Sequence, residues 1–158
     1  PVLLVSLDAF RADYLDWGLT PNISTMVREG VRAEWMTPTY PSLTFPNHYS
    51  IVTGLHADHH GIVHNTMRDA KLGAFSLSNR ESVTNGAWWG GEPVWVTAER
   101  AGLPTATFFW PGSEAEIRGA AKPNRLPARL ARPFQGSRTP FRGRPAHPRS
   151  CSCCPTCR

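Results

Sequence analysis

The chain has 158 residues, and its formal net charge of +5 at pH 7 averages two unlike segments. All twelve acidic residues lie between Asp8 and Glu116, whereas ten of the seventeen basic residues follow from Arg118 onward with no acid among them. The whole-chain charge therefore does not indicate a nucleic-acid-binding protein, and the length favours one domain. No apolar run approaches the ~20 residues that a membrane-spanning helix needs.

The basic segment, 118–158, also differs in apolar content. It contains no Val, Ile, Met or Trp, and all four cysteines of the chain crowd into 151–157. Such a composition cannot bury enough apolar surface to offset the entropy of ordering it. We therefore expect a folded region at 1–117 and a disordered Arg/Pro-rich tail at 118–158. Zinc sites usually use two separated Cys or His pairs, so the crowded thiols do not predict a metal site.

The first predicted element is a strand at 2–7, where only Ser6 interrupts an apolar run. Such a run is typical of a strand buried on both faces of a parallel sheet. Asp8 would then follow its carboxyl end, where open α/β sheets bind ligands. Residues 21–30 predict a short helix with Thr20 as its N-cap.

Helices and strands alternate along the following residues. Residues 44–53 predict a helix that has Thr44 at its N-terminus and Gly54 as its stop. The other expected elements are strands at 31–36, 62–65 and 75–77, a helix at 93–101, and a second inner strand at 105–110. This alternation predicts an α/β fold with a parallel sheet.

Three polar side chains, Asp8, Thr44 and Asn65, each lie at the end of an apolar segment. A hydroxyl is a weak nucleophile unless it is activated, for example by a metal that a carboxylate helps to hold. A helix N-terminus and an amide both stabilise phosphate oxygens. Together these groups are suited to metal-assisted phosphoryl transfer. Taken singly, Thr44 can be a helix cap, and Asp8 and Asn65 can be turn residues.

Nearby histidines have weaker signals. His48 follows Thr44 by four residues and shares its helical face, and we expect it to have a structural role. In 58–60, an Asp precedes two adjacent histidines, whose side chains diverge and lack the spacing of a helical zinc pair. We do not expect a metal site there.

Together these residues resemble the nucleotide pyrophosphatase/phosphodiesterase family of the alkaline phosphatase superfamily, with bacterial members looking most similar. The resemblance covers about residues 1–117. The stretches that carry it include Val5-Ser-Leu-Asp-Ala-Phe-Arg-Ala-Asp13, Tyr40-Pro-Ser-Leu-Thr-Phe-Pro-Asn-His-Tyr49, His59-His-Gly-Ile-Val-His-Asn65 and Trp88-Trp-Gly-Gly-Glu-Pro-Val-Trp95.

The resemblance implies a mixed or parallel sheet flanked by helices, and a role for each candidate residue. Thr44 matches the nucleophile, which also touches a metal, and Asp8 matches a ligand of one of two zinc ions. Asn65 matches the amide that binds a phosphate oxygen, and Phe45 an aromatic residue beside the nucleobase. The implied substrates are nucleotide phosphodiesters and pyrophosphates, and the implied location is periplasmic, secreted or surface-attached.

Only part of the family pattern is present. The Asp-x-x-Gly-His and Asp-His-Gly patterns that would supply the remaining metal ligands do not occur. We therefore expect an inactive fragment, and hypothesise that a frameshift produced 118–158. The alternative is a non-catalytic protein whose basic tail binds nucleic acid or an anionic surface. Few aromatic residues interleave with the arginines of that tail, so specific nucleic-acid recognition is not expected.

Overall fold

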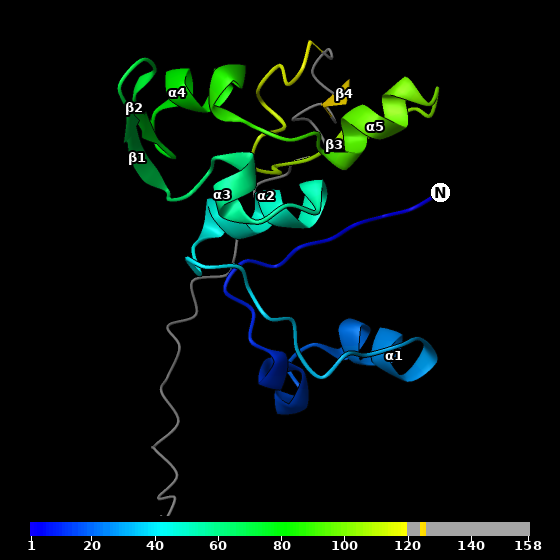
Figure 1. Cartoon of the computed structure of the whole chain (residues 1–158). Coiled ribbons are helices and arrows are strands. Elements are labelled where there is room, and N and C mark those ends of the chain that lie inside the picture. Colours follow the sequence, from blue (N-terminus) through cyan, green and yellow to red (C-terminus); the bar gives the residue numbers. More distant parts are fainter. Residues whose placement is uncertain (120–123, 126–158) are drawn as a thin grey trace, which may run out of the picture. The chain divides into compact units, whose positions relative to one another are not determined.

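The computed structural model describes residues 1–119 and 124–125 (Figure 1), so most of the predicted tail, including the cysteines, lies outside the described residues. The described residues belong to one compact unit, Pro1–Leu126. In chain order the elements are η1 (Ala12–Trp17), α1 (Pro21–Glu29), α2 (Thr44–Thr53), α3 (Ala57–His60), β1 (Thr66–Asp69), β2 (Gly73–Ser76), α4 (Arg80–Thr84), η2 (Gly86–Trp88), α5 (Val94–Arg100), β3 (Ala106–Thr107) and β4 (Asn124–Arg125).

The three predicted helices are confirmed as α1, α2 and α5. The start of α2 follows Leu43, whose backbone is extended, and its end is Gly54 in the left-handed region at φ 69°. The N–H of Gly54 donates to the carbonyl of Ser50 at 2.9 Å, which closes the last turn. Thr20 precedes α1 as expected, but its hydroxyl makes no capping hydrogen bond.

The strands form two small ladders. β1 and β2 pair antiparallel, with Asp69 opposite Gly73, and β3 pairs parallel with β4. The turn between β1 and β2 is closed by Asp69, whose carboxylate accepts hydrogen bonds from the N–H groups of Lys71 (2.7 Å) and Leu72 (2.9 Å). These bonds lower the pKa of Asp69. Helices and strands together confirm the α/β class.

The predicted strand positions are partly wrong. Residues 2–7 and 31–36 form no strand in the described part of the chain. Val2 and Leu3 are 99% and 87% exposed. An apolar run of this kind becomes an inner strand only when neighbouring strands cover it, and sequence alone does not show whether they do. The strand expected at 62–65 begins instead at Thr66, and that expected at 105–110 is reduced to β3.

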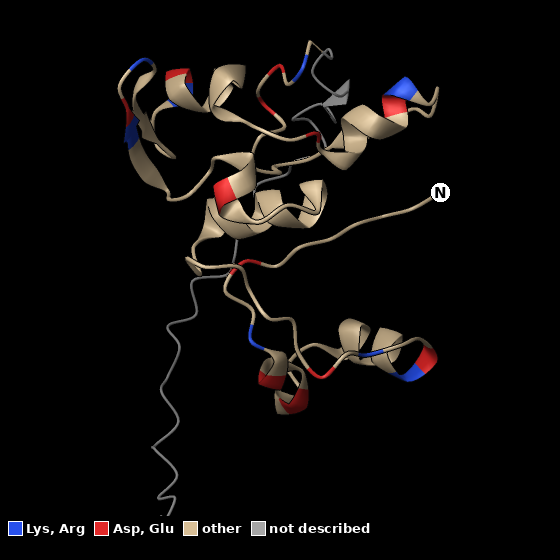
Figure 2. Cartoon of the chain, in the orientation of Figure 1, with Lys and Arg blue, Asp and Glu red and all other residues tan. Residues whose placement is uncertain are grey.

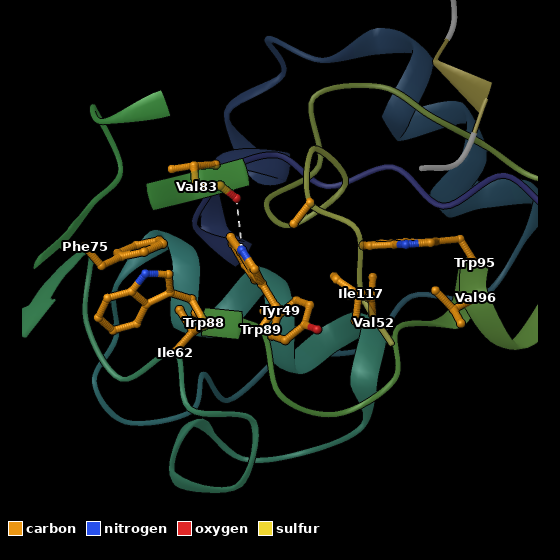
Figure 3. Close-up of a cluster of buried hydrophobic side chains, with 11 residues drawn as sticks. Tyr49, Val52, Ile62, Phe75, Val83, Trp88, Trp89, Trp95, Val96 and Ile117 are labelled. Atoms are coloured by element: carbon orange, nitrogen blue, oxygen red, sulfur yellow. Dashed lines mark hydrogen bonds between the residues drawn. The ribbon is translucent and has the colours of Figure 1, made fainter. Parts of the chain in front are cut away.

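The buried core is aromatic and is built from 49–117 (Figure 3). Its members are Tyr49, Val52, Ile62, Phe75, Val83, Trp88, Trp89, Trp95, Val96, Ala115 and Ile117. The Trp89 ring meets Tyr49 edge-on at 4.9 Å between centroids, and its Nε1–H donates to the carbonyl of Val83 at 3.0 Å. The polar end of the indole is thereby paired inside the core. One face of α2 is thus anchored, which fixes the helix that begins at Thr44.

Charged residues of both signs are interspersed along the described elements (Figure 2). Arg32 pairs with Asp16 at 2.9 Å, and Arg11 pairs with Asp13 at the same distance. Both pairs are largely exposed, so each adds little stability. Among the described residues, no helix is both long and apolar enough to cross a membrane.

Candidate active site

Thr44 and Asp8, 36 residues apart in sequence, meet through their side chains. The Thr44 hydroxyl Oγ1 donates to Oδ2 of Asp8 at 3.2 Å. Thr44 is the first residue of α2, whereas Leu43 holds the N-cap position, so the alternative role of Thr44 as a helix cap is wrong. After Asp8 the chain turns sharply at Ala9, which has a φ of 56° that is uncommon for a residue with a Cβ.

The loop that leads into α2 is held by Asn47, which sequence analysis did not single out. Oδ1 of Asn47 accepts from the N–H of Thr39 at 2.8 Å. Its Nδ2 donates to the carbonyls of Pro41 at 3.0 Å, Leu43 at 2.9 Å and Thr39 at 3.3 Å. One side chain therefore fixes both ends of the loop, and with them the position of Thr44. The sequence signal for this role is an Asn within the first turn of a helix that follows a proline-containing loop.

Asn65 lies against the N-terminus of α2. Its Oδ1 accepts from the N–H of Phe45 at 3.0 Å, which satisfies a donor that the helix itself leaves unpaired. Pro46 contributes no N–H to this turn. Of the amide donors of the first three helical residues, only that of Thr44 has no hydrogen bond to the described part of the chain. Nδ2 of Asn65 likewise makes no hydrogen bond to a described residue, so two donors remain at the start of α2.

The Phe45 side chain is half-buried against the core. Its ring centroid lies 6.1 Å from that of Phe75 and 6.0 Å from that of Trp89. The core thus fixes one side of the ring and leaves the rest of it accessible. The structure thereby brings together all four predicted site residues: Thr44 contacts Asp8, and Asn65 contacts the backbone of Phe45.

His48 lies one helical turn behind Thr44 and connects three segments. Its Nδ1 lies 2.8 Å from the carbonyl oxygen of Thr44, and its Nε2 lies 3.0 Å from Oγ of Ser6. The indole of Trp110 donates to the His48 carbonyl at 3.1 Å, and the two rings meet edge-on. The structural role predicted for His48 therefore has a defined geometry. Ser6 was missed, although the apolar run from 2 to 7 contains no other polar residue.

The side chains of 58–60 point in different directions. His60 is fully buried, with Nε2 2.9 Å from Oγ of Ser50 and Nδ1 accepting from the N–H of Ile62 at 3.1 Å. Burial lowers the pKa of His60, which keeps the ring neutral near pH 7. Asp58 and His59 instead form an exposed pair 3.7 Å apart. These groups do not converge on one ion.

The donor set at Thr44 fits part of a zinc site. The hydroxyl and carboxylate oxygens lie 3.2 Å apart, close enough for one ion to contact both, because zinc–oxygen distances are about 2.0–2.2 Å. Zinc sites in proteins use three or four protein ligands. No group of three or more His, Cys, Asp or Glu side chains suited to a metal occurs among residues 1–119. Asp8 and Thr44 can therefore supply two ligands, and the described residues do not complete the shell.

Known proteins with similar sequences are nucleotide phosphodiesterases of animals. The chain is 52% identical over 123 residues to the venom phosphodiesterase of Naja atra, and 55% identical over 122 residues to human ectonucleotide pyrophosphatase/phosphodiesterase family member 1. These matches cover 76% and 75% of this chain, but 15% and 13% of the relatives. These relatives are animal proteins and do not support the expected similarity to bacterial members.

Solved structures agree with the sequence matches. Murine ectonucleotide pyrophosphatase/phosphodiesterase 5 superposes with a TM-score of 0.71 at 37% identity, over 77% of this chain and 33% of that chain. The human counterpart gives 0.73 at 38% identity, over 80% and 34%. The sequence model of type I phosphodiesterase / nucleotide pyrophosphatase matches residues 2–149. The chain belongs to the type I phosphodiesterase/nucleotide pyrophosphatase family.

Proposed function

We propose that this chain provides the nucleophile and the adjoining phosphate-binding groups of a site that hydrolyses nucleotide phosphodiester or pyrophosphate bonds. The observation that carries the proposal is the contact between Oγ1 of Thr44 and Oδ2 of Asp8, 3.2 Å apart at the start of α2. In this arrangement the hydroxyl lies beside a carboxylate and at the positive end of a helix. Because the chain belongs to a phosphodiesterase family, the group that this hydroxyl would attack is a phosphate ester.

Thr44 is the nucleophile in this proposal. Its Oγ1 forms a bond to phosphorus as the bond from phosphorus to the leaving alcohol or phosphate breaks. This leaves a nucleotidyl group on Thr44, and the proton of the Thr44 hydroxyl is balanced by the one that the leaving group takes up. Water then attacks phosphorus, the bond to Oγ1 breaks, and a nucleoside monophosphate is released. In support, a murine relative described as inactive carries a threonine-to-alanine change and is in complex with AMP.

The two donors at the start of α2 are suited to the phosphate oxygens. The N–H of Thr44 and Nδ2 of Asn65 make no hydrogen bond to another described residue. Fixed donors of this kind stabilise negative charge that develops on phosphate oxygens during the reaction. The half-buried ring of Phe45 follows Thr44 directly and offers a flat apolar surface for the nucleobase.

Asp8 and Thr44 would hold zinc together. The ion supplies a Lewis acid that favours the deprotonated hydroxyl and offsets charge on the phosphate. The chain covers a third of the solved relatives, and the described residues offer only two of the three or four ligands that zinc requires. We therefore propose that this chain alone has no turnover above background.

Hydrolysis of a nitrophenyl nucleotide ester with added zinc tests the inactivity. Zinc-dependent turnover that is lost in Thr44→Ala would contradict inactivity while supporting the nucleophile. Thr53→Ala is the matched control, because Thr53 ends the same helix and its hydroxyl donates to the carbonyl of Tyr49 at 2.7 Å. Turnover retained in Thr44→Ala would refute the assignment of Thr44.

Binding of AMP tests the phosphate-binding groups without requiring activity. We expect AMP with zinc to shift the NMR signals of the Thr44 amide and of the Asn65 side-chain amide. The side-chain amide of Asn79, which caps α4 through bonds to Glu81 and Ser82, is the control. Equal shifts at Asn79 and Asn65, or none at Thr44, would refute the proposed role of these donors.

A further inference from the structure

The segment that carries Asp8 contacts α2 at two points with matching spacings. Asp8 and Ser6 are two residues apart, and both side chains face α2. Thr44 and His48 are four residues apart in a helix and also share one side. The Asp8–Thr44 contact is 3.2 Å and the Ser6–His48 contact is 3.0 Å, so the two pairs lie in register.

Side chains alone fasten this segment. Residues 2–8 make no backbone hydrogen bond to any described residue. Ser6 is half-buried, whereas every other residue in 1–9 is exposed. The Ser6–His48 bond is therefore the anchor nearest to Asp8 along the chain, two residues before it.

The hydrogen bonds of His48 define its tautomer. A carbonyl oxygen can only accept, so Nδ1 of His48 must carry the proton that it donates to the carbonyl of Thr44. In the neutral ring Nε2 is then an acceptor, and the hydroxyl of Ser6 donates to it. His60 has the opposite form, because its Nδ1 accepts from the N–H of Ile62 and its Nε2 therefore faces Ser50 as the donor.

The ring of His48 is itself held in place. Nδ1 bonds to the helix that begins at Thr44, and Trp110 packs edge-on against the ring while donating to the His48 carbonyl. Ser6 therefore binds to a fixed acceptor. An anchor two residues away keeps Asp8 within about 7 Å of a fixed point, which limits the positions that its carboxylate can take relative to Thr44.

We propose that Ser6 and His48 are positioning residues that hold the carboxylate of Asp8 against the hydroxyl of Thr44. The importance of this positioning for catalysis rests on the proposed function, whereas the positioning itself does not. Asp8 and Thr44 would take part in the reaction. Ser6 and His48 would not, and would act only by bringing those two residues together.

Ser6→Ala in the full chain tests the positioning by NMR. We expect the nuclear Overhauser contact between the β-protons of Asp8 and the methyl group of Thr44 to be lost in Ser6→Ala and retained in Ser6→Thr, which keeps the hydroxyl. Ser50→Ala is the matched control. Ser50 lies on α2, as His48 does, and its hydroxyl contacts a different histidine, His60, so its loss should leave the contact between Asp8 and Thr44 intact.

The ring nitrogens give a second, spectroscopic readout. In the wild type we expect a protonated Nδ1 in His48 and a protonated Nε2 in His60, with Ser6→Ala shifting only Nε2 of His48. An Asp8–Thr44 contact that persists in Ser6→Ala, or a protonated Nε2 in neutral His48, would overturn the inference.

Addition of Mn²⁺ separates this inference from the proposed function. Broadening of the Asp8 and Thr44 signals in the wild type, weakened in Ser6→Ala but not in Ser50→Ala, supports both. If Ser6→Ala abolishes the contact but Mn²⁺ broadens neither signal in the wild type, the positioning stands and the metal assignment fails.

Discussion

Replacement of Asn65 should change stability in opposite directions, depending on the group introduced. Asn65 acts as a remote cap of α2, because its Oδ1 accepts from the N–H of Phe45 at 3.0 Å. Asn65→Ala removes the acceptor, and loss of a helix cap lowers the free energy of unfolding by about 1 kcal/mol. Asn65→Asp keeps an acceptor and adds a negative charge at the helix N-terminus, which is worth about 0.3–1 kcal/mol.

We therefore expect the free energy of unfolding to fall in the order Asn65→Asp, wild type, Asn65→Ala. The extremes should differ by about 1–2 kcal/mol. Urea denaturation followed by tryptophan fluorescence measures this at pH 7. The gain in Asn65→Asp should shrink at high salt, which screens the helix dipole. If Asn65→Asp is less stable than Asn65→Ala, the carbonyl oxygen of Asn65 does not act as the cap.

The same variants separate capping from phosphate binding. AMP with zinc should stabilise the wild type, since a ligand that binds only the folded state raises the free energy of unfolding. It should not stabilise Asn65→Asp, which has lost the Nδ2 donor and repels the phosphate. Asn79→Ala, which removes the cap of α4, should lose stability like Asn65→Ala but keep the wild-type response to AMP. Equal responses in wild type and Asn65→Asp would refute a phosphate-binding role for Asn65.

Three further substitutions test the fold by urea denaturation. Asn47→Ala should lower the free energy of unfolding by about 2–3 kcal/mol, since its three shorter hydrogen bonds, to Thr39 N–H and to the carbonyls of Pro41 and Leu43, are worth about 1 kcal/mol each. A loss below about 1 kcal/mol would contradict the role of Asn47 in holding the loop at 39–43. Tyr49→Phe should raise it by about 1 kcal/mol at pH 7, because the buried hydroxyl has no partner among the described residues. Burial also raises the pKa of Tyr49, so above about pH 10, where unfolded tyrosine ionises, the wild type should lose stability that Tyr49→Phe retains; parallel pH profiles would refute this. Gly86→Ala should lower the free energy by at least ~1–3 kcal/mol, because its Cβ would lie 1.9 Å from the carbonyl oxygen of Glu116, and wild-type stability would show that this approach is absent.

Local sequence patterns predicted the helices more accurately than the strands. The bounds of α2 follow from Pro46 near its beginning and Gly54 after its end. Both residues act on the backbone within a few residues. The apolar run at 2–7 predicts burial, but the run itself does not show which strands, if any, would cover it. A strand is defined by its partners, so its position cannot be obtained from one segment alone.

The contacts within the site divide in the same way. Thr44 and Asn65 could be singled out as candidates because both lie in recognisable motifs, and Thr44 also begins a helix. Asn47 and Ser6 could not, because their roles depend on how a loop and an extended segment fold back on α2. Ser6 lies 42 residues from His48, and neither residue type indicates such a pairing by itself.

The hydroxyl of Thr44 and the carboxylate of Asp8, which meet at the start of α2, differ in how firmly the structure holds them. Thr44 belongs to a helix whose Tyr49 and Val52 are buried in the aromatic core. Asp8 belongs to the segment at 2–8, which only side chains hold in place. If a cation bridges the pair as proposed, this segment would lose part of its remaining conformational entropy on binding. Binding of the proposed cation and ordering of this segment would then be linked, so a change that loosens the segment would also weaken cation binding.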